Sequence, residues 1–221
     1  MPHVIVSYDG TRNDRDALAL GRLFAHAGAK ISLAYVRHAP GADPESEAAS
    51  QQEAEHLLAV GADQVESADV GQHVIVNPST AAGLAALAAE LGADALAFGS
   101  SYRTPPGRVG LPQTAEQLLD RGVAFSIALA PAGLRREPVQ HSIGTVGVYG
   151  RDDEAAVATA ASLAYALGAV VTEDEADLLV IASRRDATPG QLLLSGPARD
   201  QVEQALCPVL ALARGAGLSF G

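Results

Sequence analysis

Residues 99–114 are the part of this sequence whose types and spacing could do chemistry. They combine glycines, hydroxyl side chains and two cations, namely Gly99, Ser100, Ser101, Arg103, Gly107, Arg108, Gly110 and Thr114. Glycines let backbone amides approach the oxygens of a phosphate group, while hydroxyl and guanidinium groups donate hydrogen bonds to them. The chemistry indicated is phosphate binding, in a loop that ends at the N-terminus of a helix.

The elements that must position this loop alternate between strands and helices. Apolar runs bounded by turn residues predict five strands, at 3–8, 31–36, 73–76, 93–99 and 124–130. Helical spacing and helix-starting residues predict helices between them, at about 14–27, 44–60, 79–91 and 112–119. This alternation predicts an α/β fold with a doubly wound, parallel, five-stranded sheet.

A second, shorter copy of the pattern follows residue 141. The ends of the two copies align without a gap, 92–132 on 175–215, whereas their beginnings align at a larger offset, 6–29 on 146–169. The second copy therefore lacks a stretch that held two strands and two helices in the first. The sequence predicts a complete domain at 1–133, a linker at 134–141, and a truncated domain at 142–221 with about three strands.

The truncation leaves the chain path of the second copy open. In a doubly wound sheet the first helix leads outward, to a strand on the far side of the first strand. Without that excursion, the remaining helix changes faces, or residues 170–175 cross back, or the small sheet borrows neighbours from the first domain. The short copy has too little core to stand alone, so we expect it to pack against the complete one through the fifth strands.

Several segments resemble the universal stress protein family. Residues 6–11, a buried strand that ends in an aspartate and a small turn, look like the family's opening. Residues 93–101, followed by 114–119, are similar to its fourth strand, loop and fourth helix. Residues 205–210 resemble its usual approach to the fifth strand.

The resemblance covers nearly all of 3–133 and, in abbreviated form, 142–215. It implies a stress-linked regulatory role and dimers or tandem pseudo-dimers joined through their last strands. The partner is then the chain itself or another protein at the fifth-strand edges, as a pseudo-dimer within the chain or as a homodimer. Many members of the family bind ATP and others do not.

The loop departs from the pattern of ATP-binding members. Those members have a glycine after the fourth strand, another three residues on, and, after nine more residues, a glycine followed by serine or threonine. Here Gly99 is in place, but Tyr102 and Pro112-Gln113 stand at the other positions. Since proline has no amide hydrogen and a tyrosine could fill the space of a phosphate, we expect weakened or lost nucleotide binding.

Asp9 and Val36 end the first two strands, at the switch region where the resemblance places the nucleoside and where doubly wound proteins bind ligands. A turn residue that caps the next helix is an equal interpretation of Asp9, and ordinary core is the better one for Val36. Solvated charge is the better interpretation of Arg103 and Arg108. The predicted cofactor-binding set is Asp9, Val36, Gly99, Ser100, Ser101, Arg103, Gly107, Arg108 and Thr114. Its ligand would be ATP or another adenine nucleotide, with no metal beyond the magnesium that the nucleotide carries.

The second copy departs further. Ala182 replaces the glycine of the loop, Arg185 stands at the position of the tyrosine, and Ser195-Gly196 reverses the expected order. Tyr149 takes the place of the strand-ending aspartate. We therefore expect no nucleotide site there, and a structural role in covering the dimerisation edge of the first domain.

Composition excludes several other classes. A net charge of −11 opposes binding to nucleic acid or to anionic lipid. The apolar runs are far shorter than the ~20 residues that span a bilayer, and the chain begins directly with a strand pattern rather than a leader. The only cysteine, Cys207, suits a core position and a reducing compartment, which predicts a cytoplasmic protein. Six histidines without metal-ligand spacing, no Gly-x-Ser-x-Gly elbow and no Walker lysine give no catalytic residue and no metal site.

Three hypotheses follow. The first is a non-enzymatic regulatory protein of the stress response, with weak or lost binding of adenine nucleotides. The second is an ATP-binding, slowly hydrolysing switch that holds the nucleotide with residues of the predicted set. The third is a purely structural scaffold whose pocket is filled by Tyr102.

Overall fold

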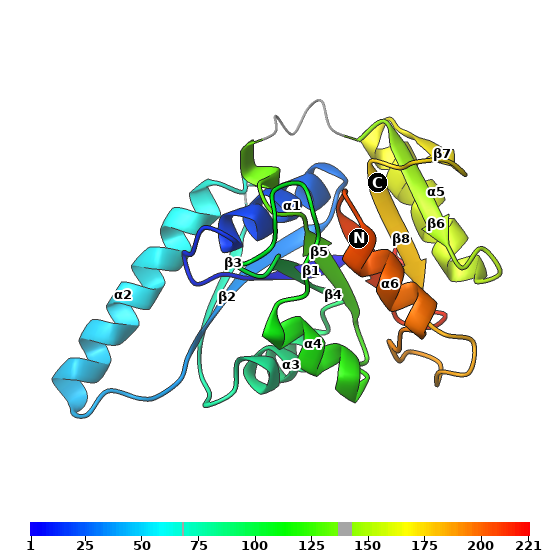
Figure 1. The fold of residues 1–221 in the computed structure, drawn as a ribbon. Helices are drawn as coiled ribbons and strands as arrows, with labels where there is room; N and C mark the ends of the chain where they lie inside the picture. The colour runs from blue at the N-terminus through cyan, green and yellow to red at the C-terminus, as the bar shows by residue number, and fades with distance from the viewer. Residues whose placement is uncertain (68, 137–142) are drawn as a thin grey trace.

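The predicted α/β class is confirmed by a computed structural model, which describes residues 1–67, 69–136 and 143–221. Strands and helices alternate along the described chain (Figure 1). In chain order they are β1 (His3–Ser7), α1 (Asp14–His26), β2 (Lys30–Arg37), α2 (Pro44–Asp63), β3 (Gly71–Val76), α3 (Thr80–Leu91), β4 (Ala95–Gly99), α4 (Gln113–Arg121), β5 (Ser126–Ala130), the 3-10 turn η1 (Leu134–Arg136), β6 (Thr145–Tyr149), α5 (Glu154–Leu167), β7 (Val170–Thr172), β8 (Leu178–Ala182), α6 (Gly196–Gln204) and β9 (Val209–Leu212).

The first five strands form a parallel sheet in the order β3-β2-β1-β4-β5. Strands β1, β4 and β5 are buried almost throughout. Helices cover them on both faces, which explains why their sequences are continuous apolar runs rather than alternating patterns. Their observed bounds lie within two residues of the predicted ones.

The two faces of the sheet have separate cores. Val4 and Val6 of β1 join a core cluster with α1, α2 and α5, whereas Ile5 joins a second cluster with α3, α4 and α6. Successive residues of a strand point to opposite faces, so the two clusters are the two sides of one sheet. Figure 1 shows α1 on one side of the strands and α3 and α4 on the other.

Local signals set the ends of the helices. The side chains of Asp43 and Ser79 cap α2 and α3 by accepting hydrogen bonds from the amides of Ser46 and Ala82. Gly92 ends α3 in the left-handed conformation, with φ of 59°, which side chains rarely adopt. These boundaries follow directly from the local sequence.

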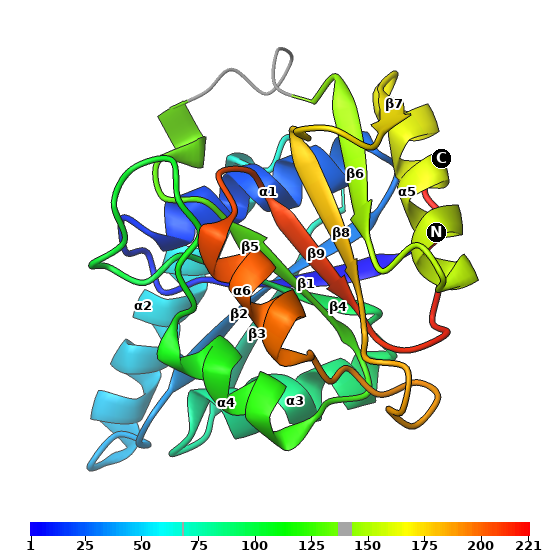
Figure 2. The ribbon, with the colours of Figure 1, turned by 45° about the vertical axis from the view of Figure 1, so that its right-hand side comes forward.

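The two halves of the chain share one sheet. Strand β9 pairs with β5 in antiparallel orientation, with Leu129 opposite Val209 and Ile127 opposite Ala211. Figure 2 shows the two strands side by side. The complete order is β3-β2-β1-β4-β5-β9-β8-β6-β7. The fifth strands therefore meet as expected, and each occupies the edge that a second copy of the chain would need.

Matching hydrogen bonds show that the second half repeats the first. Ser100 Oγ accepts a hydrogen bond from Gly110 N at 3.1 Å, and its counterpart in the repeat, Ser183 Oγ, accepts one from Leu193 N at 2.9 Å. The loops also reach across the junction in a reciprocal manner. Val109 N donates to Ala205 O at 3.0 Å, and its counterpart Leu192 donates to Val123 O at 2.7 Å. The pairing is thus a pseudo-two-fold arrangement.

The chain path of the second half combines the second and third of the three predicted paths, since the chain crosses back and β9 also has β5 of the first half as a neighbour. Helix α5 leads outward to β7, a three-residue strand parallel to β6 that adds a fourth strand to the three expected. Residues 173–177 then cross back over β6 to begin β8. A Cβ at Gly147 would lie 2.8 Å from Ala176 Cβ, so glycine in β6 makes room for the crossing chain.

The connector begins with a buried ion pair. Asp16 of α1 is 1% exposed and accepts hydrogen bonds from Gly133 N, Arg135 N and Arg135 Nη1. These contacts hold η1 against α1, so residues 134–136 of the predicted linker are fixed to the first half. Residues 137–141 of that linker lie outside the described residues, and the domain boundaries stay a prediction.

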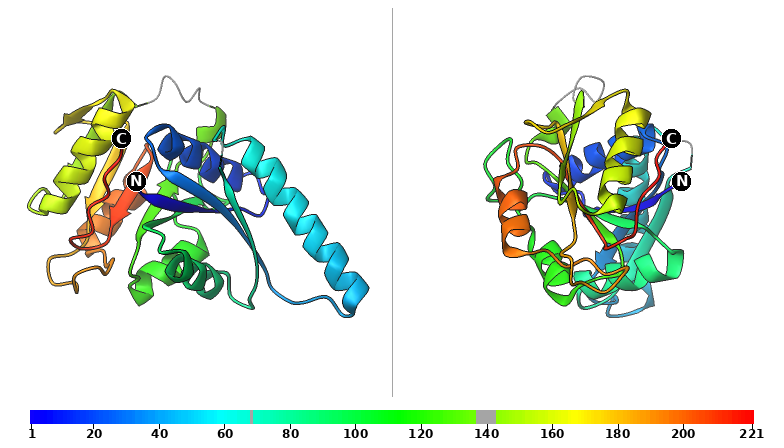
Figure 3. Two further views of the ribbon diagram at one scale, coloured as in Figure 1. Left: turned by 180° about the vertical axis from the view of Figure 1, so that it is seen from behind. Right: turned by 90° about the vertical axis from the view of Figure 1, so that its right-hand side faces the viewer.

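The C-terminal segment joins the two halves on the α1 and α5 side. Leu218 N donates to Thr159 Oγ1 at 2.8 Å, and Gly221 N donates to Ala27 O at 3.0 Å. The ring of Phe220, 4% exposed, stacks on Phe24 with centroids 5.7 Å apart. Figure 3 shows this segment, in red, running beside α5. The sequence pattern did not predict this role.

We expect Asp16→Ala to destabilise the protein. The substitution leaves the Arg135 guanidinium and two backbone amides without their acceptor, which should lower the free energy of unfolding by about 2–4 kcal/mol. Urea unfolding followed by circular dichroism measures this. Asp120→Ala, which breaks the exposed ion pair with Arg199, is the control and should be nearly neutral. Equal effects of the two variants would contradict the importance of the buried pair.

Phe220→Ala tests the C-terminal contact. Removing a buried ring that stacks on another should cost about 2–4 kcal/mol, near the lower end for buried aromatic residues because the chain end can relax. The measurement is the thermal midpoint. Tyr165→Ala on α5 removes a ring that is 85% exposed and should change stability by less than about 0.5 kcal/mol. A neutral Phe220 variant would show that the tail does not hold the halves together.

Candidate functional site

The loop after β4 is held by Ser100. This residue is 2% exposed, and its hydroxyl donates to Ala130 O at 2.7 Å while it accepts from Gly110 N at 3.1 Å. Ser183 likewise accepts from the amide of Leu193 in the second half, which has a different loop sequence. Ser100 therefore shapes the loop.

Backbone amides of the loop bind carbonyl groups of the protein. Ser101 N donates to Gly110 O, Thr104 N to Ser101 O, and Arg108 N to Pro105 O, at distances of 2.9–3.2 Å. Gly107, with φ of 78°, donates to Ala132 O at 2.8 Å. A phosphate cradle needs amides that point outward, so these four donors are already committed.

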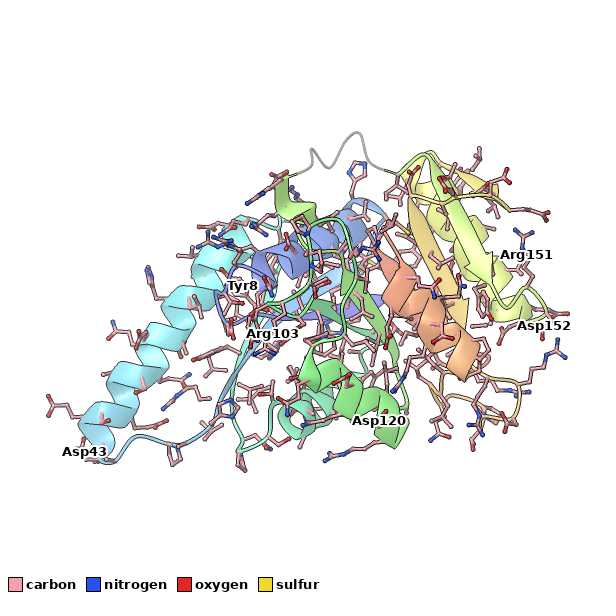
Figure 4. All side chains as sticks on the ribbon, in the orientation of Figure 1. Tyr8, Asp43, Arg103, Asp120, Arg151 and Asp152 are labelled. Carbon is pink, nitrogen blue, oxygen red and sulfur yellow. The ribbon has the colours of Figure 1, made fainter. Side chains whose placement is uncertain are left out.

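Tyr102 does not fill the site, contrary to the expectation from the sequence. Its side chain is 78% exposed, and the Arg103 guanidinium carbon lies 5.1 Å from the centre of its ring. The two side chains thus form a cation–π contact at the surface of the protein. Figure 4 labels Arg103 on the loop. Arg108 is also exposed.

The chain's own backbone occupies the space beside Gly99. A Cβ at this position would lie 2.0 Å from Asn13 O, and Asn13 Nδ2 donates to Ser100 O at 2.7 Å. The turn after β1 therefore packs directly against the end of β4. Glycine is needed at 99 for this close approach, which explains the residue without a phosphate.

Asp9 lies in this turn, beside Asp14 at the start of α1. Asp9 Oδ1 accepts from Thr11 N at 2.9 Å, and Asp14 Oδ2 accepts from Asp9 N at 2.6 Å. Burial, together with the hydrogen bond and charge of Asp9, raises the pKa of Asp14 to about 8. Burial also opposes ionisation of Asp9, but hydrogen bonds from Asp14 and Thr11 outweigh it and hold the pKa of Asp9 below its usual value. Nothing in the sequence indicated this role of Asp14, because its spacing also suits the first turn of a helix.

The predicted residues gather at one edge of the sheet but differ in surroundings. Asp9 follows β1, and Gly99 and Ser101 lie at the end of the neighbouring parallel strand β4, which brings the three together. Val36 is 8% exposed and packs in the core near α3, and Thr114 is half-buried in the first turn of α4. As a binding set they stay a prediction.

Comparison with known proteins decides the family. The sequence model of the universal stress protein family matches residues 1–122, more than half of the 221-residue chain. The chain belongs to the universal stress protein family. Among curated proteins, no sequence matches it significantly.

Solved structures of universal stress proteins share the fold of the whole chain. A universal stress protein from Archaeoglobus fulgidus is 14% identical with a TM-score of 0.70, and the match covers 96% of this chain and 98% of that one. A protein of unknown function from Pseudomonas aeruginosa is 13% identical with a TM-score of 0.68, and the match covers 97% of this chain and 93% of that one. A putative universal stress protein from another strain of that species is 14% identical with a TM-score of 0.63, and the match covers 96% of this chain and 93% of that one. At these identities the likeness shows the fold, which extends over both halves.

Three further observations concern other chemistries. Each helix in the described part of this universal stress protein is too short or too polar to cross a membrane. Among the described residues, no three His, Cys, Asp or Glu side chains gather as metal ligands. Cys207 is half-buried rather than in the core, and burial raises the pKa of its thiol to about 11.

Stability should fall as the pH rises toward 8. The pKa of Asp14 is about 8 in the folded state and 3.8 ordinarily, so the folded protein keeps a proton that the unfolded chain releases. The stabilisation is full below the ordinary pKa and is lost as the pH rises through the folded value. We expect a lower thermal midpoint at about pH 8.5 than at about pH 6, and a smaller difference in Asp14→Asn, which cannot ionise.

The matched control is Asp120→Asn, an exposed carboxylate on α4 that should leave the pH dependence of the wild type unchanged. If Asp14→Asn and the wild type show the same dependence, Asp14 is not the group that holds the proton.

Proposed function

We propose that this universal stress protein is a non-enzymatic regulatory protein of the stress response, in which the first half has weak or no binding of adenine nucleotides. The packing of Asn13 against Gly99 carries the proposal, because it places backbone where the phosphate chain would approach the end of β4. The committed amides of the loop support it. The single cysteine fits a role in the cytoplasm.

Weak binding of a nucleotide through side chains is the second candidate. Arg103, Arg108 and Ser101 keep exposed or half-exposed polar groups on the loop, beside the end of the sheet where Asp9 lies. A switch that binds and slowly hydrolyses ATP would need these groups to turn inward. The cation–π contact of Arg103 with Tyr102 lies at the surface, so it opposes such a movement only weakly.

The fold also supports a proposal about where partners bind. A homodimer through the fifth-strand edges would require β5 or β9 to leave its present neighbour. We propose that the second half acts in place of a second subunit, and that regulatory partners bind elsewhere. The scaffold hypothesis is compatible with a second half that acts in place of a second subunit. It also required a pocket filled by Tyr102, whereas the side chain of Tyr102 points outward.

Calorimetry with ATP and magnesium on the full chain tests the proposal. We expect no binding tighter than about 100 μM, because the phosphate donors are engaged within the protein. Chromatography of the nucleotide should show no ADP formed above the rate without protein. Binding tighter than that limit, abolished by Asp9→Ala while Asp120→Ala binds normally, would favour the switch instead.

A further inference from the structure

A cavity of about 700 Å³ lies at the junction of the two halves. It is bordered by the end of α6, by the chain that crosses back before β8, and by residues that follow β5. Its volume is within the range of about 300–1,000 Å³ that is usual for ligand sites. Gly107 is the one residue of the predicted binding set that lines this cavity, so its chemistry has to be read from other side chains.

The cavity lies where the described part of the second half has no counterpart of α3. In the first half α3 lies beside α4 (Figure 1), and Leu118 of α4 and Leu96 of β4 are buried in one core cluster with residues of α3. Their counterparts are Gln201 of α6 and Leu179 of β8, which are only partly buried and line the cavity. The missing helix therefore leaves part of α6 and of the sheet uncovered.

Apolar side chains form much of the lining. Leu206, at the end of α6, is 66% exposed, more than any other leucine or isoleucine among the described residues. Its counterpart in the first half, Val123, is half-buried. An exposed apolar side chain beside an apolar cavity is typical of a surface that another molecule covers. The apolar residues that line the cavity are Pro131, Leu134, Ile143, Leu179, Leu206 and Pro208.

The charged residues of the lining are acidic. Asp174, Glu175 and Asp177 line the cavity, and no lysine, arginine or histidine of the described chain does. Asp177 is engaged, since it accepts hydrogen bonds from the amides of Gly144 and Thr145. Asp174 and Glu175 are exposed and form no ion pair with a described residue. Two carboxylates of the lining are therefore available to a cationic partner.

We infer that this cavity receives a basic amphipathic helix of another protein, in the position that corresponds to α3. Apolar side chains on one face of that helix enter the cavity, as in other complexes in which a helix binds a groove. Its lysines or arginines pair with Asp174 and Glu175, and this complementary charge selects the partner and sets its orientation. The inference rests on the proposed regulatory function and names the chemistry of its partner.

Fluorescence anisotropy of labelled peptides with the full chain tests the inference. The probe is a helical peptide of leucine, lysine and alanine whose leucines form one face. In one control peptide glutamate replaces each lysine, and in the other serine replaces each leucine. We expect saturable binding of the probe with a Kd below about 100 μM, and at least about tenfold weaker binding of both control peptides. Equal binding of the serine peptide would overturn the inference, because charge alone would then explain the binding.

Variants of the chain locate the binding. Asp174→Asn combined with Glu175→Gln should weaken binding of the probe about fivefold or more. The matched control is Glu45→Gln with Glu53→Gln, which removes the same charge from exposed positions on α2 and should bind the probe like the wild type. Leu206→Ser, at an exposed position, should fold normally and weaken binding about threefold or more. The inference is overturned if the probe does not saturate, if the two double variants bind it equally, or if Leu206→Ser binds it like the wild type.

Sedimentation velocity of the full chain without peptide tests a second copy as the occupant. We expect no dimer at this surface, and a dimer that Leu206→Ser dissociates would overturn the choice of partner. Calorimetry with ATP reports on the proposed function separately. Tight binding of ATP contradicts that function, whereas a failure of the probe to bind contradicts only this inference.

Discussion

The antiparallel pairing of β5 with β9 is the interaction on which the rest of the structure depends. Each strand would otherwise expose a row of unpaired amides and carbonyls at a sheet edge. The described part of the second half has four strands and two helices, a small core that we expect to depend on the first half for its stability. Joined to β5, it extends a sheet whose two faces have continuous cores, and Val109 and Leu192 cross the junction in both directions.

The shortening of the second copy changed one connection, from β7 to β8, but kept the order of the strands. The order β7-β6-β8-β9 repeats β2-β1-β4-β5 of the first half. Helix α5 still runs outward, so its crossover keeps the usual hand, and β7 receives it. The return over β6 is short because Gly147 lets Ala176 pass close to the strand. The repeat thus kept the strands next to the junction and shortened the part farthest from it.

The sequence predicted the order of strands and helices, since each strand is an apolar run and each helix has local start and stop signals. It also predicted the meeting of the fifth strands, through the repeat. It could not predict β7, because three residues carry no periodic pattern, nor the contacts of Asp16 and Phe220, which join positions far apart in the chain. The outward turn of Tyr102 likewise depends on a neighbour, Arg103, rather than on a motif.

A glycine motif and an open site are different properties of this fold. The first half keeps Gly99, and the missing side chain allows Asn13 to close the edge of the sheet. The second half has Ala182 at this position, and a Cβ at Gly150, in the turn after β6, would lie 2.7 Å from its Cβ. In each half a glycine therefore permits the turn after the first strand to pack against the fourth, Gly99 in the strand of the first half and Gly150 in the turn of the second. Sequence patterns describe the loop after the fourth strand, and they miss this second surface because it comes from a turn near the start of the domain, far from the loop in the chain.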